Sequence, residues 1–179
     1  MSLHGKKVAI LTEEGFEEVE LTKPQKAIED AGGETFIISP ESGKIKSWDF
    51  TDWGKAYEVD VKLDEAKASD YDALLLPGGV INPDKLRLNK AALDFIKAFV
   101  ESSKPVAAIC HAPWSLVEAK VVSGKKMTSY TSIKTDVENA GATWVDEPVV
   151  VDGNLITSRN PDDLEIFSKT LVEAIEKGS

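Results

Sequence analysis

Short unbroken runs of apolar residues recur along the chain, separated by longer stretches in which apolar residues have helical spacing. Such short runs are typical of strands that are buried on both faces of a parallel sheet. The strands predicted in this way are residues 7–11, 34–39, 72–76 and 106–109. Because helical stretches connect them, the pattern predicts β-α-β units with right-handed crossovers and therefore a parallel sheet.

Helical periodicity marks most of the remaining chain. In the segment 89–100, Leu93, Ile96 and Phe99 fall on one side of a helix, as expected for a helix packed on a sheet. The predicted helices are a helix that begins in residues 12–20 and ends at Asp30, followed by residues 89–100, 114–120, 132–140 and 162–177.

Turn-forming and polar residues fill the gaps. Residues 40–54 and 82–84 have the composition of loops, and residues 57–61 and 127–130 fit short strands. The pair Asp152-Gly153 lies between the β-rich runs 149–151 and 154–158, which predicts a hairpin with a type I′ turn. We therefore predict one α/β domain over residues 1–179: a three-layer sandwich with a mostly parallel sheet and an antiparallel hairpin at one edge.

Composition narrows the function. With 21 basic and 31 acidic residues, the net charge of −10 argues against nucleic acid or an anionic membrane as a partner. One cysteine allows no internal disulfide and agrees with a reducing cytoplasm. Two histidines and that cysteine make a zinc site improbable, and we expect no metal or other cofactor. No apolar stretch predicts a membrane span or signal peptide, and residues 1–3 look like an expression leader.

The single cysteine occupies a position that favours reactivity. Cys110 directly follows the predicted strand 106–109, is followed by His111, and precedes a helix with Pro113 in its first turn. In open α/β sheets, ligands bind at the carboxyl ends of the strands, and a sharp strand-to-helix turn can expose a nucleophile there as a nucleophile elbow. The alternative is a buried cysteine that acts only as a small hydrophobic residue. The residues alone leave both open.

Two further segments end near this turn in the predicted fold. Gly78-Gly79 follows the strand 72–76, where backbone N–H groups could hold an oxyanion, although a plain tight turn explains the glycines equally well. The acidic segment 12–20 follows the first strand. Its glutamates fit a solvated helix face, but one of them could point inward toward the cysteine strand.

Five segments, in order, carry a resemblance to a known family. They are F-E-E-V-E at residues 16–20, L-L-P-G-G at 75–79, P-D-K-L-R-L-N at 83–89, A-I-C-H-A-P at 108–113 and T-S-Y-T-S-I-K at 128–134. Together they resemble the PfpI family, which belongs to the superfamily of the Parkinson-linked protein deglycase and the class I glutamine amidotransferase fold. The resemblance covers essentially the whole chain.

The resemblance implies roles for the catalytic positions. Cys110 matches the family nucleophile and His111 its neighbouring histidine. Glu17 matches the buried glutamate that hydrogen-bonds the sulfur. Asp84 matches an acid that reaches a histidine of a neighbouring subunit, which implies a homodimer or higher homo-oligomer.

Binding positions follow in the same way. Gly79 and the His111 N–H match the oxyanion hole, with Gly78 beside it, and Tyr130 falls near the site. Where the family usually has glycine, two residues after the cysteine, this chain has Ala112. The added methyl group is expected to narrow the pocket or shift the turn.

By this resemblance the chain is a cysteine-dependent hydrolase that acts on aldehyde or dicarbonyl adducts, as a deglycase or glyoxalase-like enzyme, or on peptides, in stress protection. The alternative is a redox-sensing stress protein whose Cys110 is oxidised without turnover. Amidotransferase activity is disfavoured because those domains use a late histidine and no histidine follows His111.

Overall fold

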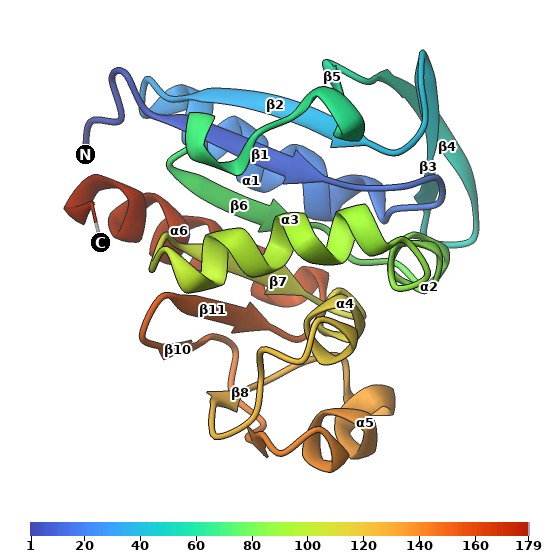
Figure 1. Cartoon of the computed structure of the whole chain (residues 1–179), viewed down its shortest axis with the longest axis vertical. Coiled ribbons are helices and arrows are strands. Elements are labelled where there is room, and N and C mark those ends of the chain that lie inside the picture. Colours follow the sequence, from blue (N-terminus) through green and yellow to red (C-terminus); the bar gives the residue numbers. More distant parts are fainter. Residues whose placement is uncertain (179) are drawn as a thin grey trace.

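A twisted seven-stranded sheet forms the centre of the computed structural model, which describes residues 1–178 (Figure 1). The strand order is β10-β11-β7-β6-β1-β2-β5, and every neighbouring pair is parallel except β10 with β11. The strands of this sheet are β1 (Lys7–Leu11), β2 (Glu34–Ser39), β5 (Val61–Lys62), β6 (Ala73–Leu76), β7 (Val106–Ile109), β10 (Val150–Asp152) and β11 (Leu155–Ser158).

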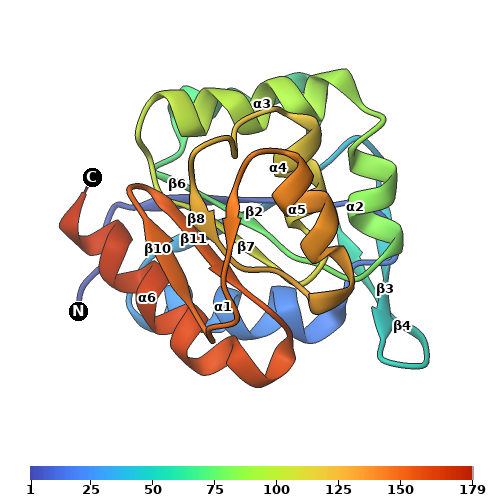
Figure 2. The same cartoon turned by 90° about the horizontal axis from the view of Figure 1, so that it is seen from below.

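Helices cover both faces of this sheet and complete three layers (Figure 2). On one face, α1 (Glu18–Asp30) packs beside α6 (Leu164–Lys177). The other face carries α3 (Lys90–Glu101) and the short helices α2 (Ile81–Leu86), α4 (Pro113–Glu118) and α5 (Lys134–Asn139). Two apolar clusters therefore form the core, one on each side of the sheet. The predicted three-layer α/β architecture is confirmed.

The apolar composition of the central strands explains why they lie in the middle of the sheet. Every residue of β6 and β7 is buried, since helices cover both of their faces. Continuous apolar runs without alternation are what such strands require. Asn89 accepts a hydrogen bond from the N–H of Ala92 and so caps α3 at the predicted start of that helix.

The segment 40–54 was predicted as a loop, and this prediction is wrong. It contains β3 (Lys44–Asp49) and the start of β4 (Asp52–Glu58), and the two strands form a hairpin that projects from the sheet edge (Figure 2). Its faces are largely exposed, so its sequence lacks the apolar run of a core strand. Carboxylates near the start of α1 hold it instead: Glu14 accepts from the N–H of Lys46, and Glu18 accepts from the hydroxyl of Tyr57.

Smaller elements also differ from the predictions. Residues 82–84 lie inside α2 rather than in a loop, because Pro83 is in the first helical turn, where no hydrogen bond from its nitrogen is needed. The run 57–61 is divided between β4 and β5, and β8 (Lys126–Met127), paired with β9 (Thr143–Trp144), is shorter than predicted. In the edge hairpin Asp152 pairs with Leu155, so Gly153 and Asn154 form the turn.

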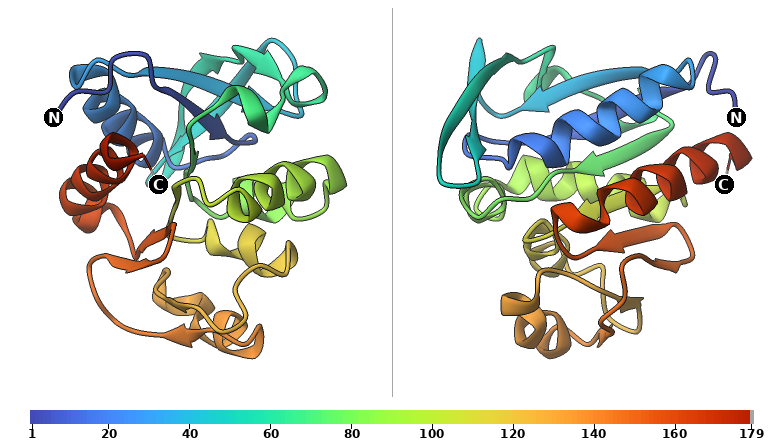
Figure 3. Two further views of the ribbon diagram at one scale, coloured as in Figure 1. Left: turned by 60° about the vertical axis from the view of Figure 1, so that its left-hand side comes forward. Right: turned by 180° about the vertical axis from the view of Figure 1, so that it is seen from behind.

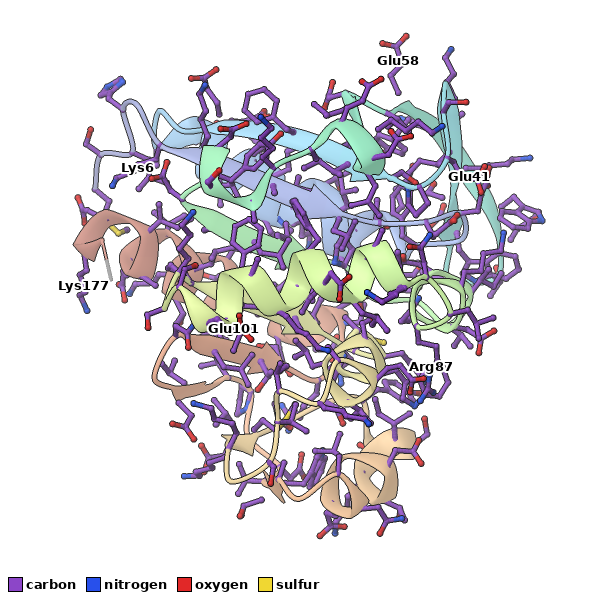
Figure 4. The ribbon with its side chains drawn as sticks, in the orientation of Figure 1. Lys6, Glu41, Glu58, Arg87, Glu101 and Lys177 are labelled. Atoms are coloured by element: carbon purple, nitrogen blue, oxygen red, sulfur yellow. The ribbon has the colours of Figure 1, made fainter. Side chains whose placement is uncertain are left out.

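Both ends of the described chain lie on the same side of the molecule, away from the carboxyl ends of the parallel strands (Figure 3). Leu3, in the predicted leader, is fully buried, and its N–H donates to the carbonyl of Ala31. Charged side chains labelled in Figure 4, such as Lys6, Glu58 and Lys177, point outward. Within residues 1–178 no helix has the length and apolar character needed to cross a bilayer.

Candidate active site

Cys110 occupies a strained turn between β7 and α4. Its φ angle is +65°, a left-handed conformation that is uncommon for a residue with a side chain. Two backbone hydrogen bonds hold the turn: the Cys110 N–H donates to Ser158 at 3.1 Å, and the Cys110 carbonyl accepts from the N–H of Tyr130 at 2.8 Å. Such strain persists only where the surroundings enforce it, and it often accompanies function.

The strained turn brings the cysteine and the next residue together. The sulfur lies 3.2 Å from Nδ1 of His111, although adjacent residues would not face each other on a helix. Nε2 of the same ring lies 3.2 Å from Oγ of Ser132, and Tyr130 stacks on the ring at a centroid distance of 4.7 Å. Burial lowers the pKa of His111, which favours a neutral imidazole that can accept a proton.

The carboxyl group beside the sulfur belongs to Glu20. The resemblance assigned this role to Glu17, and the structure contradicts that assignment. Glu20 is completely buried in the first turn of α1, and its carboxyl is within hydrogen-bonding reach of the Cys110 thiol. Glu17, at the N-cap, is only half-buried, and its Oε2 accepts from the N–H of Phe50 at 3.1 Å. The backbone explains the difference: residues three apart share a face only within a helix, and Glu17 has extended angles (φ −66°, ψ 118°) just before the helix begins.

The Gly78-Gly79 turn closes over this pair. Both N–H groups donate to Oε1 of Glu20, at 3.0 and 3.2 Å. A Cβ atom on Gly78 would lie 2.5 Å from that oxygen and 2.7 Å from Cβ of Cys110, so only glycine fits between them. The N–H groups of Gly79 and His111 also point at the sulfur. The turn therefore contributes hydrogen-bond donors to the site. The alternative that the two glycines form only a tight turn is wrong.

The protonation states of the sulfur and the carboxyl depend on each other. Burial, followed by the charge of Glu17, raises the pKa of Glu20 to about 8. Burial and the charge of Glu20 raise the pKa of the Cys110 thiol, while the N–H groups of Gly79 and His111 oppose this rise. A Glu20 carboxyl that is protonated near neutral pH removes the repulsion and can donate a hydrogen bond to the sulfur, which favours the thiolate.

A cavity of about 380 Å³ opens in front of the sulfur. Cys110 is 7% exposed and His111 equally so, and both line this cavity. The other lining residues are Gly15, Glu17, Trp48, Phe50, Gly79, Val80, Ile81 and Tyr130. The thiol is thus reachable by a small molecule, as a reactive cysteine requires.

Two positions predicted at the site lie elsewhere in the described chain. Asp84 is exposed on α2, and no hydrogen bond or ion pair joins it to His111 within residues 1–178. Ala112 is 1% exposed and belongs to the apolar cluster beneath α4. Its methyl group points into the core and does not narrow the cavity, contrary to the expectation from the sequence.

Several residues of the site were not identified from the sequence. Asn82 is fully buried, accepts from the N–H of Glu13 at 2.7 Å and donates to the carbonyl of Pro77 at 2.8 Å, so it joins the loops after β1 and β6. Trp48 and Phe50 reach the cavity from the β3–β4 hairpin, and Ser132 contacts His111 from a distant segment. Trp48 and Phe50 belong to a segment that was predicted as a loop, and that prediction did not place them at the site.

The fold and this site define a class of protein: a three-layer α/β sandwich with a cysteine held at the turn after a central strand. Comparisons with known proteins agree. A model of the DJ-1/PfpI family matches residues 6–174. The chain belongs to the DJ-1/PfpI family.

Individual relatives match over nearly the whole chain. General stress protein 18 of Bacillus subtilis is 45% identical over 175 residues, which are 97% of this chain and 99% of the relative. Deglycase PfpI of Pyrococcus furiosus is 39% identical over 170 residues, 95% of this chain and 99% of the relative.

A solved structure gives the same result for the fold. A two-domain protein from Anabaena variabilis, with DJ-1/ThiJ/PfpI-like and ferritin-like domains, superposes with a TM-score of 0.90 at 38% identity. The match covers 97% of this chain and 49% of the other, so this chain spans about half the length of the two-domain protein.

Proposed function

We propose that the protein is a cysteine-dependent hydrolase that acts on aldehyde or dicarbonyl adducts in stress protection. The observation that carries this proposal is the Cys110 sulfur at the mouth of a cavity, 3.2 Å from His111 and beside the Glu20 carboxyl. The names of the relatives, a general stress protein and a deglycase, support the same reading.

Each group has a chemical task in the proposed reaction. The Cys110 thiolate attacks the electrophilic carbon and forms a carbon–sulfur bond. The N–H groups of Gly79 and His111 stabilise the oxyanion that develops on the substrate oxygen. The neutral imidazole of His111 accepts and returns protons. Glu20, when protonated, donates to the sulfur and keeps it anionic before attack.

The overall reaction balances without an external oxidant. For a methylglyoxal adduct of a thiol, the aldehyde-level carbon is oxidised to a carboxylate while the adjacent ketone carbon is reduced to an alcohol. The bond between the adduct carbon and the original thiol breaks as Cys110 forms its own bond to that carbon, and the thiol leaves. The hydrogen of this carbon then moves to the ketone carbon, which leaves a lactate thioester on Cys110. Water cleaves this thioester and releases lactate and the free Cys110 thiol. The net reaction is therefore a hydrolysis in which one carbon of the substrate is oxidised and the adjacent carbon is reduced.

The experiment compares the wild type with Cys110→Ser in two assays: lactate formation from methylglyoxal and from its thiol and amine adducts, and cleavage of a panel of peptides. We expect wild-type turnover of the adducts and a loss of at least 100-fold in the variant, since serine is a poor nucleophile without the thiolate. Equal lactate formation by both proteins would reject the proposal. Cleavage of peptides alone would reassign the enzyme as a peptidase.

A second candidate function is redox sensing. The same thiolate, surrounded by N–H donors and reachable through the cavity, is suited to attack peroxide, which releases water and leaves a sulfenic acid. Mass spectrometry of the intact protein after mild peroxide would then find one added oxygen on Cys110. Oxidation there without turnover of any adduct favours this alternative, while absence of oxidation excludes it.

Two further parts of the proposal concern the oligomeric state of the enzyme and its cellular compartment. We propose a homo-oligomer in which Asp84, exposed on α2, reaches and orients His111 of a neighbouring subunit. We also propose that the protein acts in the cytoplasm, because an unpaired cysteine of this kind is maintained in a reducing compartment.

A further inference from the structure

The cavity in front of Cys110 has an unusual distribution of charge. Among the residues 1–178 that line it, Glu17 is the only acidic one, and none is a lysine or arginine. The surroundings of Glu17 add further negative charge: burial raises the pKa of Glu17, and the nearby carboxylates of Asp49 and Glu18 raise it further. A ligand at the sulfur therefore meets one carboxylate and no compensating cation in the wall.

The position of Glu17 is fixed by the fold. Its main-chain N–H donates to the carbonyl of Gly78 at 3.3 Å, and its Oε2 accepts from the N–H of Phe50 at 3.1 Å. These bonds tie it to the glycine turn on one side and to the β3–β4 hairpin on the other. A carboxylate held in this way and half-buried acts on a ligand through a medium of lower dielectric constant than water.

Aromatic rings form much of the rest of the wall. Trp48 and Phe50 come from the hairpin, and Tyr130 stacks on His111. Faces of aromatic rings attract cations, most strongly when the cation is poorly hydrated, as quaternary ammonium groups are. Carboxylate and rings thus favour the same kind of ligand.

We propose that this cavity selects cationic carbonyl adducts over anionic ones, and that Glu17 is the residue that sets the preference. The substrate class rests on the function proposed above, in which Cys110 attacks the adduct. The charge preference of the cavity itself does not depend on turnover.

The first test measures access to the sulfur. Cys110 is the only cysteine in the chain, so a methanethiosulfonate reagent reports on it alone. The rate at which Cys110 is modified is measured with a cationic reagent, which carries a trimethylammonium-ethyl group, and with an anionic one, which carries a sulfonato-ethyl group. To correct for intrinsic reactivity, each rate is divided by the rate at which the same reagent modifies free 2-mercaptoethanol. We expect the corrected rate with the cation to exceed that with the anion about tenfold at low salt, and the ratio to fall as salt is added.

Two variants test whether Glu17 causes the difference between the two modification rates. Glu17→Gln keeps the shape and the acceptor for Phe50 but removes the charge, and should bring the ratio close to one. Glu165→Gln removes the same charge from the exposed face of α6, outside the cavity, and should leave the ratio unchanged. A wild-type ratio near one would overturn the proposal, and a ratio that survives Glu17→Gln would overturn the role of Glu17.

The second test extends the preference to substrates. Methylglyoxal adducts of thiocholine, 2-mercaptoethanol and 3-mercaptopropionate carry the same reacting group with a positive, neutral or negative tail. We expect kcat/KM for lactate formation to fall in that order over about tenfold in total, and the order to be lost in Glu17→Gln. Equal values for all three would overturn the substrate preference alone. Lactate formation from none of them would reject the proposed function, while the reagent ratio still decides the charge preference.

Discussion

Replacing Glu20 by glutamine should remove a specific pH dependence of stability. Glutamine has nearly the same shape, and its carbonyl oxygen can still accept from the N–H groups of Gly78 and Gly79. Only the ionisation is lost. Because Glu20 lies fully inside the fold, its ionisation opposes folding, and this opposition raises its pKa from 4.5 to about 8.

The sign of the effect follows from proton linkage. Between pH 4.5 and about 8 the folded protein holds a proton on Glu20 that the unfolded chain has released. The wild type therefore loses stability as the pH rises through this window, by at most about 1.4 kcal/mol per pH unit. Integrated from pH 5 to pH 8, the loss that Glu20 causes is about 3 kcal/mol.

Urea denaturation of both proteins at several values of pH between 5 and 8 provides the measurement. Burial also raises the pKa of Glu13 and of Glu17, but these groups are present in both proteins, so their contributions cancel in the difference. The difference in stability between Glu20→Gln and the wild type should shift in favour of the variant by about 3 kcal/mol over this range, or roughly 1.5 M in the urea midpoint. Parallel curves would show that Glu20 is already ionised at pH 5 in the folded state, and the proposed hydrogen bond to the sulfur would then fail.

Two further predictions concern Asn82 and Asp84. Asn82→Ala leaves the buried N–H of Glu13 and the carbonyl of Pro77 without partners and should cost about 3 kcal/mol in urea unfolding; a loss below about 1 kcal/mol would contradict the structural role. Sedimentation at micromolar concentration should find an oligomer, and Asp84→Asn should lower kcat and shift its pH profile without unfolding the protein. A monomeric wild type with full activity would refute the proposed contact between subunits.

The order of apolar runs was sufficient to predict the sheet and the larger helices. Strands buried on both faces need unbroken apolar segments, so β1, β6 and β7 could be located from composition alone. The position of Cys110 at the end of β7 followed from the same pattern, because parallel strands place their carboxyl ends at one edge of the sheet.

The β3–β4 hairpin could not be predicted, since its stability comes from distant side chains. Its residues are mostly exposed and carry little apolar signal of their own. Three glutamates reach it from the loop before α1, from the N-cap and from the first helical residue, through hydrogen bonds that form only in the folded chain: Glu14, Glu17 and Glu18. Sequence alone suggested a solvated acidic face for these residues.

The choice between Glu17 and Glu20 marks the limit of what the sequence determined. The sequence established that an acidic segment follows the first strand and that one glutamate could point toward the cysteine strand. Which one does so depends on the rotation of α1 about its axis, and packing of its apolar side chains on the sheet sets that rotation. Tertiary structure therefore decided that Glu20 faces the sulfur and Glu17 faces the cavity, because burial and direction are properties of the packed helix.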